Sequence, residues 1–365
     1  MKIGILTVPF NNNYGGFLQA YALKKVLVDV GHEVIFISRK RNKKKISFLK
    51  RMIGLPYYWL KDHKQNRQQS YISKYTELFK VNYLSPITED YYTAKQLKNC
   101  LNYNFDAVVV GSDQVWRYRY AKDSIDDFYC NFLEGNTIKR IAYAASFGTD
   151  EQEYPDDKLK VCSKLIKEFS LITVREQGGK NLLTNFFGLS DNQVQVVLDP
   201  TLLLSVDEYR ELFKHYEPPK DNYIFTYILD RNEDKQKLIN IVCKEKGLKE
   251  ISMCAQTGVQ KDVMPIEAVE LWLNRIYHAD FVITDSYHGT VFSILFNKPF
   301  VVYGNKQRGI SRFDTLLNMF NLSARLVFSS VDYIAEDQIE WDKINRILSQ
   351  NRNISKTLLL NGLND

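Results

Sequence analysis

The sequence predicts an α/β protein of two consecutive domains, each with a mainly parallel sheet covered by helices on both faces. Short apolar runs alternate with helical periodicity along most of the chain, which is the pattern of strands joined by helical crossovers. A length of 365 residues suits two domains. The segment EPPKDN at 217–222 is the strongest break between two such series, so we expect a cleft between the domains to hold the functional site.

The first domain is expected over residues 1–215. Its opening residues indicate a strand, a polar loop with glycines, a helix and a second strand, because the periodicity changes from an apolar run to a helical repeat and back. Later apolar runs predict the remaining strands. The expected strands are 3–8, 33–38, 105–113, 138–148, 170–176 and 194–201, and the helices are 17–30, 157–169 and 178–187.

The second domain is expected over residues 216–340, followed by a C-terminal helix or tail over 341–365. The same alternation of strands and helices continues after the break. Ligands of open α/β sheets collect outside the carboxyl ends of the strands, so polar residues at these ends are the candidate site. The expected strands are 223–229, 250–255, 280–284 and 299–303, and the helices are 233–246, 266–279 and 289–296.

Positive charge is concentrated in one segment of the chain. The formal charge is +6, yet eight basic residues and no acidic one lie in 39–51, and the rest of the chain has 41 basic and 43 acidic residues. A duplex-binding domain spreads its cations over a face, so no nucleic-acid partner is expected. The insertion 39–60 also carries aromatic and aliphatic side chains, which predicts peripheral contact with an anionic membrane. The alternative is a surface helix and loop packed on the domain.

Other features of the composition exclude several classes. No apolar run approaches the about 20 residues of a membrane-spanning helix. The five cysteines are odd in number and lack metal-ligand spacing, which suits a reducing compartment. We therefore expect a cytoplasmic location, at most peripheral at the inner face of the cell membrane. The chain has no Walker lysine, dinucleotide glycine spacing or histidine cluster, so no nucleotide cofactor and no metal are expected.

The densest polar group is expected at residues 285–288, between a strand and a helix. Backbone N–H groups at a helix start favour an anion, and His288 there can move a proton. The alternative is a purely structural histidine. Together with cations that follow the next expected strand, this group suits a substrate with a phosphate or a carboxylate. Those cations are Lys306, Arg308 and Arg312.

Strand ends of the first domain supply further candidates. Arg175 suits forked recognition of a carboxylate or phosphate; the alternative is a salt bridge with Glu176 or a neighbouring carboxylate. The polar loop 11–16 follows the first expected strand, at the edge where ligands gather. The candidate binding residues in it are Asn13, Tyr14 and Gly15.

The run VVVGSDQVW places three candidates after another expected strand. Asp113 and Gln114 can hydrogen-bond sugar hydroxyls, and Trp116 can stack on a sugar face. The alternative is that Asp113 caps the next helix and Trp116 belongs to the core.

In this order, these segments resemble the polysaccharide pyruvyl transferase family. Each segment is weak alone, but the ordered series is fairly specific and spans roughly residues 1–320. The resemblance implies a GT-B-like architecture, with two Rossmann-like domains facing a cleft. The segments are NNYGGFLQAYAL at 12–23, VVVGSDQVW at 108–116, ITVRE at 172–176, LDPT at 198–201 and TDSYHGTVFSILFNKPFVVYG at 284–304, followed by Lys306.

The resemblance implies transfer of the pyruvyl group of phosphoenolpyruvate to a sugar as a ketal, with release of phosphate. The implied acceptor is a galactose- or mannose-type residue of a lipid-diphosphate-linked surface polysaccharide precursor. Arg175 and Lys306 match basic donor-site positions of the family, and His288 matches its key histidine. An imidazole can protonate the enol carbon or assist phosphate departure, while cations hold the leaving group. Phosphoenolpyruvate is a substrate here, so no resident cofactor is implied.

The sequence departs from the family at one point. Many members have Arg-Leu immediately before the key histidine, where this chain has Ser286 and Tyr287. A donor-site cation is missing there, and Arg308 or Arg312 is expected to replace it. Two other functions fit the predicted architecture: a nucleotide-sugar glycosyltransferase, and a non-catalytic glycan-binding protein that uses Trp116.

Overall fold

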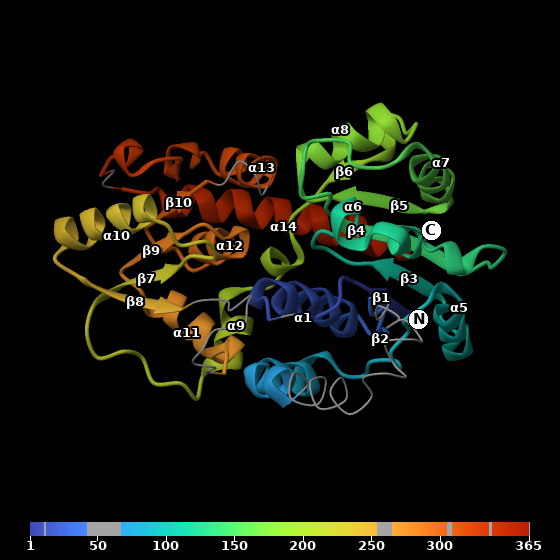
Figure 1. Ribbon diagram of the computed structural model, residues 1–365, viewed down its shortest axis with the longest axis horizontal. Coiled ribbons are helices and arrows are strands. Elements are labelled where there is room, and N and C mark those ends of the chain that lie inside the picture. Colours follow the sequence, from blue (N-terminus) through green and yellow to red (C-terminus); the bar gives the residue numbers. More distant parts are fainter. Residues whose placement is uncertain (11, 42–66, 254–264, 305–308, 336–337, 365) are drawn as a thin grey trace, which may run out of the picture.

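Two parallel sheets, one in each half of the chain, organise the protein (Figure 1). The computed structural model describes residues 1–10, 12–41, 67–253, 265–304, 309–335 and 338–364. Within these residues, six strands form the first sheet in the order β2-β1-β3-β4-β5-β6, and five form the second in the order β11-β10-β9-β7-β8. Neighbouring strands are parallel in both sheets. The predicted fold class is therefore confirmed.

The first lobe consists of the six-stranded sheet and the helices around it. Its strands are β1 (Lys2–Leu6), β2 (Glu33–Ile37), β3 (Ala107–Val110), β4 (Lys139–Ala145), β5 (Leu171–Val174) and β6 (Gln195–Val196). Its α-helices are α1 (Tyr14–Asp29), α4 (Lys74–Phe79), α5 (Ala94–Leu97), α6 (Tyr118–Ala121), α7 (Asp156–Leu165) and α8 (Gln177–Phe186). Shorter 3₁₀ or π-helical segments are Lys80–Leu84, Lys98–Tyr103, Lys122–Tyr129, Asn131–Leu133, Ile166–Glu168, Asp191–Gln193 and Pro200–Leu203.

The second lobe consists of the five-stranded sheet and its helices, and α9 (Val206–Phe213) leads into it. Its strands are β7 (Tyr223–Tyr227), β8 (Lys249–Met253), β9 (Phe281–Thr284), β10 (Phe300–Tyr303) and β11 (Leu326–Val327). Its α-helices are α10 (Glu233–Lys246), α11 (Val269–His278), α12 (Tyr287–Leu295) and α13 (Ser311–Met319). Two 3₁₀ segments are Ser323–Arg325 and Ser330–Asp332.

The inner strands are mostly apolar because both faces of each sheet are covered there. In β3, Val108 and Val110 pack into a core on one face, while Ala107 and Val109 pack on the other, as the two-residue period of a strand requires. The core on the α1 side of the first sheet continues into the second lobe, where it includes Phe225 and residues of α11 and α12. The two lobes therefore share one continuous core, which fixes the walls of the cleft between them.

The last helix, α14 (Trp341–Asn364), follows the second lobe in sequence but packs on the first (Figure 1). Lys139 Nζ donates a hydrogen bond to the Leu363 carbonyl at 2.7 Å, and the Leu198 N–H donates to Ser355 Oγ at 3.1 Å. The segment 341–365, expected as a C-terminal helix or tail, thus ties the end of the chain to the six-stranded sheet.

The predicted membrane-contacting insertion 39–60 lies mostly outside the described residues, which include only its first part, 39–41. The helices that the structure describes include none with the length and apolar character needed to span a membrane.

Candidate active site

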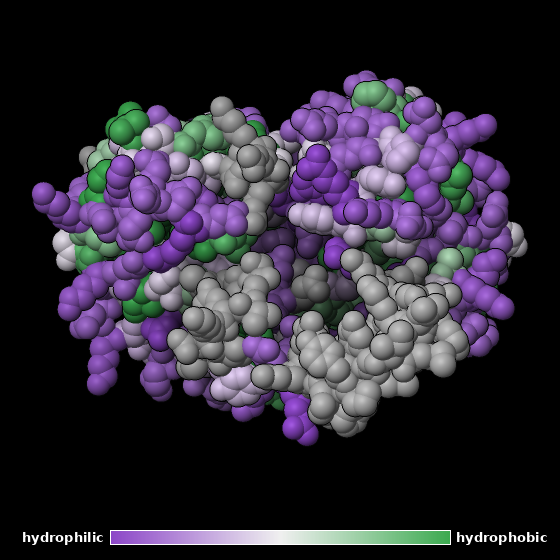
Figure 2. All heavy atoms as spheres, viewed as in Figure 1, coloured by the Kyte–Doolittle hydropathy of each residue, from purple (hydrophilic) through white to green (hydrophobic). Residues whose placement is uncertain are grey.

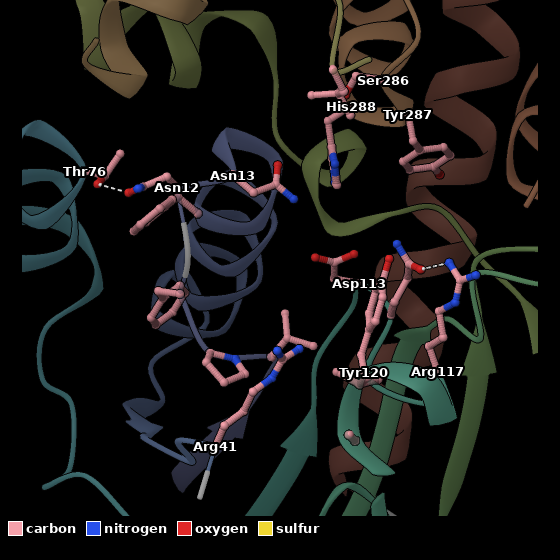
Figure 3. Close-up of a pocket in the computed structure, with 18 of the residues that line it drawn as sticks. Asn12, Asn13, Arg41, Thr76, Asp113, Arg117, Tyr120, Ser286, Tyr287 and His288 are labelled. Atoms are coloured by element: carbon pink, nitrogen blue, oxygen red, sulfur yellow. Dashed lines mark hydrogen bonds between the residues drawn. The ribbon is translucent and has the colours of Figure 1, made fainter. Parts of the chain in front are cut away.

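A cavity of about 970 Å³ lies between the two lobes, at the carboxyl ends of strands from both sheets. Figure 2 shows the surface hollowed between the lobes, and Figure 3 shows polar side chains that point into the hollow from both sides. The polar lining from the first lobe includes Asn12, Asn13, Arg41, Thr76, Asp113, Gln114 and Arg117, and that from the second includes Asp285, Ser286, Tyr287, His288 and Arg312.

His288 lies at the start of α12, on the wall that the second lobe supplies. Ser286 caps this helix, since its side chain accepts a hydrogen bond from the Gly289 N–H at 3.4 Å. Nε2 of His288 lies 3.6 Å from Asp199 Oδ2. The ring also packs so closely on α1 that a Cβ on Gly15 would come 2.0 Å from Nδ1 and 2.2 Å from Cγ. Only glycine fits at position 15 while His288 keeps this place, so both lobes hold the imidazole.

Asp199, which follows β6, is the centre of a buried polar network. Its Oδ2 accepts hydrogen bonds from Arg175 Nη1 at 2.9 Å and Ser112 Oγ at 3.1 Å, and its Oδ1 accepts from Thr201 N at 3.0 Å and Thr201 Oγ1 at 2.7 Å. Burial raises the pKa of this carboxyl, but His288, Arg175 and Thr201 together hold the pKa well below its usual range. Asp199 therefore stays ionised and can stabilise a protonated His288.

Arg175, after β5, is the positive centre of the same network. Its guanidinium lies 2.9 Å from Asp199, 3.3 Å from Asp113 and 3.5 Å from Glu176, and 4.6 Å from the centre of the Tyr287 ring. Burial lowers the pKa of Arg175, but Asp199 and Asp113 outweigh burial and raise the pKa. The side chain is fully inaccessible. The direct donor contact expected from the sequence is not found here: Arg175 lies behind the cavity wall and positions the groups in front of it.

Arg312, at the start of α13, places a cation on the cavity wall near His288. Its guanidinium lies 5.6 Å from the centre of the Tyr287 ring that Arg175 also contacts. Burial and the charge of Arg175 lower the pKa of Arg312, while burial and Asp199 raise the pKa of the Tyr287 hydroxyl, which stays neutral. The other two expected cations, Lys306 and Arg308, lie outside the described residues.

The first lobe brings three of the expected binding residues to the cavity. Asn13 caps α1, because its side chain accepts a hydrogen bond from the Gly15 N–H at 3.2 Å. Asp113 lies directly across from His288 in Figure 3. Gln114 Oε1 accepts a hydrogen bond from Arg117 Nη1 at 2.8 Å. These side chains present carboxylate and amide groups to a ligand with hydroxyls.

Two expected binding residues belong to the core instead. Trp116 is fully buried, its Nε1–H donates to the Phe128 carbonyl at 3.0 Å, and its ring stacks on Tyr129 with centroids 5.2 Å apart. Tyr14 is also fully buried, and its hydroxyl donates to the Glu267 carbonyl at 3.0 Å. The prediction that these residues bind substrate is wrong for this structure, because neither ring reaches the cavity.

Sequence reasoning missed the role of Asp199. The signal was present, since LDPT follows an apolar strand and Asp199 stands at its carboxyl end. A single acidic residue before a proline also indicates an ordinary capped turn, and Asp199 does accept the hydrogen bonds of such a turn from Thr201. Only the folded chain shows that its other oxygen faces Arg175 and His288.

Metal binding has no support from the side chains that the structure describes. No group of three or more histidine, cysteine, aspartate or glutamate residues in this part of the chain could hold a metal ion.

The fold is GT-B-like, with two Rossmann-like lobes around a cleft. The chain is similar to a UDP-GlcNAc 2-epimerase from Neisseria meningitidis bound to UDP-GlcNAc, with a TM-score of 0.55, 9% identity and coverage of 100% of this chain and 99% of that one. It is similar to a UDP-N-acetylglucosamine 2-epimerase from Rickettsia bellii, with a TM-score of 0.51, 9% identity and coverage of 100% and 97%. At such identities the similarity shows the fold alone.

The chain belongs to the polysaccharide pyruvyl transferase family, whose profile matches residues 13–307. The family resemblance inferred from the ordered motifs is thereby confirmed. Among curated proteins, no significant match to the chain is found. Membership of this family indicates a pyruvyl transferase of polysaccharide synthesis.

Proposed function

We propose that the protein transfers the pyruvyl group of phosphoenolpyruvate to a sugar of a surface-polysaccharide precursor, forming a cyclic ketal on two hydroxyls and releasing phosphate. The observation that carries the proposal is the wall around His288: an imidazole at a helix start, with an ionised carboxylate behind it and the Arg312 cation next to the neighbouring Tyr287 ring. Family membership supports pyruvyl transfer at this wall.

The donor suits this wall by its charge. Phosphoenolpyruvate carries a phosphate and a carboxylate, and both are favoured by the positive start of α12 and by an arginine fork. Arg312 lines the cavity next to the Tyr287 ring, and in this proposal it is the arginine that contacts the donor, although Ser286 and Tyr287 replace the usual residues before the histidine. Arg175 lies behind Tyr287, where its charge is paired with Asp199, Asp113 and Glu176. Lys306 is a further donor contact in this proposal, on the strength of the family motif.

The reaction moves two protons, and His288 is suited to the first transfer. Two acceptor hydroxyls lose their protons; one proton reaches the enol carbon, which becomes a methyl group, and the other leaves with the phosphate. A protonated His288 can give its proton to the enol carbon, and the Asp199 carboxylate, 3.6 Å from Nε2, faces the positive charge of the imidazolium. The central carbon then becomes electrophilic and accepts the sugar oxygen.

We propose that the rest of the cavity receives a galactose- or mannose-type residue of a lipid-diphosphate-linked precursor. A volume of about 970 Å³ is near the upper end of the range of about 300–1,000 Å³ for small-molecule sites, whereas the donor has only about ten non-hydrogen atoms. Arg41 on the first-lobe wall and the seven other basic residues of 39–51 favour an acceptor phosphate and an anionic membrane surface. In this proposal the protein acts in the cytoplasm, at the inner face of the membrane.

Transfer is tested by incubating the protein with phosphoenolpyruvate and a panel of lipid-linked galactosides and mannosides. We expect one phosphate released for each sugar that gains a carboxyethylidene group by mass spectrometry, and loss of both signals by about 10²- to 10⁴-fold in His288→Ala. UDP-GlcNAc in place of the donor is the control for nucleotide-sugar chemistry. Absence of donor binding together with no transfer to any acceptor would refute the proposal.

Membrane contact is tested separately by flotation with vesicles. We expect the protein to float with vesicles rich in anionic lipid and to be released as salt rises, because surface charge is screened within about 8–10 Å at physiological ionic strength. Flotation that depends neither on the anionic lipid content of the vesicles nor on the salt concentration would contradict this part of the proposal.

A further inference from the structure

The carboxylates that line the cavity differ in their hydrogen-bond partners and in their exposure to solvent. Asp285 is fully engaged by the fold, since its Oδ1 accepts a hydrogen bond from Leu229 N at 2.6 Å and its Oδ2 accepts from Asp230 N at 3.1 Å and Lys235 Nζ at 2.7 Å. It fixes the loop after β7 and has no oxygen left for a proton transfer. In the described part of the chain, the lining carboxylates are Glu77, Asp113 and Asp285.

Asp113 differs from the other two. Glu77 pairs with Lys80 at 3.0 Å, and its side chain is 52% exposed to solvent. The Asp113 side chain is only 11% exposed. Its Oδ1 accepts a hydrogen bond from Arg175 Nη2 at 3.3 Å, while no hydrogen bond between described residues ends on its Oδ2. In Figure 3 this carboxylate and the His288 ring point toward one another across the cavity.

The backbone holds the Asp113 carboxylate in this place. Asp113 has a φ of +73°, in the left-handed region that residues with a Cβ disfavour and that recurs at functional sites. Its carbonyl accepts hydrogen bonds from Ser146 N at 3.1 Å and Val115 N at 2.8 Å. These bonds tie the turn to β4, so the carboxylate is oriented before any substrate binds.

Pyruvyl transfer needs two groups that act in opposite directions at the same time. One must give a proton to the enol carbon, and the other must take a proton from the attacking hydroxyl. His288 reaches the cavity from the second lobe and Asp113 from the first. A substrate pair bound between the lobes would therefore meet an acid on one side and a carboxylate on the other.

We infer that Asp113 is the catalytic base that activates the acceptor hydroxyl, an inference that rests on the proposed function. The first hydroxyl gives its proton to Asp113 Oδ2 while its oxygen bonds to the central carbon of phosphoenolpyruvate, and His288 gives its proton to the enol carbon. The bond from the central carbon to the phosphate oxygen then breaks, its electron pair leaves with the phosphate, and the phosphate takes the proton from Asp113.

The second hydroxyl then closes the ketal. Its oxygen bonds to the same carbon, and its proton goes to His288, which the first transfer left neutral. Both side chains return to their starting states, and no oxidant, metal ion or further reactant is consumed. Arg175 keeps Asp113 oriented throughout, through the hydrogen bond at 3.3 Å.

The first test is Asp113→Asn, with Glu77→Gln as the matched control on the same cavity. The asparagine retains the size and an oxygen for Arg175 but is no base, so we expect kcat to fall by about 10²- to 10⁴-fold with unchanged phosphoenolpyruvate binding by calorimetry. Glu77→Gln should keep wild-type kcat, because Glu77 faces solvent and pairs with Lys80.

The second test is chemical rescue of Asp113→Gly by formate. Glycine adopts a φ of +73° without strain, so this variant keeps the turn while removing the carboxylate. We expect formate to restore part of the lost kcat in Asp113→Gly and none in His288→Ala. An Asp113→Asn protein that retains kcat, or an Asp113→Gly protein that formate does not rescue, would overturn the role of Asp113 while wild-type transfer leaves the proposed function intact. A wild-type protein without transfer would refute both.

Discussion

The two walls of the cavity are built in different ways. On the second-lobe wall, Tyr287 and His288 are 5% exposed and are backed by the buried Arg175–Asp199 pair at 2.9 Å. The first-lobe wall has the largely buried Asp113, which Arg175 also contacts at 3.3 Å, but it has an open part as well: Arg41 is exposed and Tyr120 is 46% exposed. A wall with interior support suits a small donor whose reacting atoms must be held in one geometry. An open wall suits an acceptor that is larger.

The largest expected effect comes from breaking that interior support. Arg175→Met leaves Asp199, Asp113 and Glu176 without their shared cation, so we expect the free energy of unfolding to fall by about 3–5 kcal/mol. Arg41→Ala on the open wall should change the free energy of unfolding by no more than about 0.5 kcal/mol. Chemical denaturation measures both. Similar losses of unfolding free energy in the two variants would show that the two walls do not differ in interior support.

The second effect depends on pH. The pKa of Asp199 is lower in the folded protein than its usual 3.8, so its stabilising contribution is full above the unfolded pKa and is lost as pH falls toward the folded one. We expect the difference in unfolding free energy between wild type and Asp199→Asn, about 1.5–3 kcal/mol, to be constant from pH 8 to about pH 5. Below that it should shrink. A difference that grows as pH falls would contradict this network.

A third prediction concerns the close contact between the walls. Gly15→Ala would place a Cβ 2.0 Å from His288 Nδ1, whereas the nearest atom to a Cβ on Gly16 is 3.8 Å away. Both lie in α1, where alanine is normally favoured over glycine by about 1 kcal/mol. We expect Gly15→Ala to lose transfer activity by at least about tenfold, the equivalent of about 1.4 kcal/mol in the barrier. Gly16→Ala, whose Cβ would meet Asp113 Oδ2 at 3.8 Å, an ordinary van der Waals distance, should leave His288 in place with equal or higher stability. Equal kinetics for the two variants would show that His288 does not need its present position.

The smallest expected effect is on the open wall itself. Tyr120 is 46% exposed and lies under the Arg117 guanidinium at 5.0 Å from its ring centre. Tyr120→Ala should raise the KM for the acceptor a few-fold, leave the KM for phosphoenolpyruvate unchanged and shift stability by less than about 0.5 kcal/mol. Initial-rate kinetics with each substrate varied in turn separate these outcomes. A rise in the donor KM alone would assign this wall to the donor.

Much of the fold could be predicted from the sequence, because strands buried on both faces leave a continuous apolar signal. β3 and β9 are such runs, and the helices between strands carry a helical repeat. β11 was missed, since its two residues, Leu326 and Val327, are too few to form a pattern. α13 was missed because 305–313 holds three basic residues and Gly309 and indicates a loop.

The candidate site was predicted in part for the same reason. His288, Asp113 and Arg175 follow buried strands, and parallel strands of one sheet end at one edge. How deeply each side chain is buried was not predictable from the sequence: Arg175 lies behind the cavity wall and Trp116 lies in the core. An aromatic residue that stacks on a sugar and one that packs on Tyr129 leave the same signal in a sequence, and only the surrounding contacts separate them.

In the proposed reaction the enol carbon is protonated between these walls while a sugar oxygen adds to the neighbouring carbon. The most direct measurement is transfer from phosphoenolpyruvate to a lipid-linked sugar in D₂O, followed by mass spectrometry of the ketal. An exchangeable acid such as His288 should place one deuterium in the methyl group of the wild-type product. A ketal without deuterium in its methyl group, or phosphate release without a ketal, would contradict this mechanism.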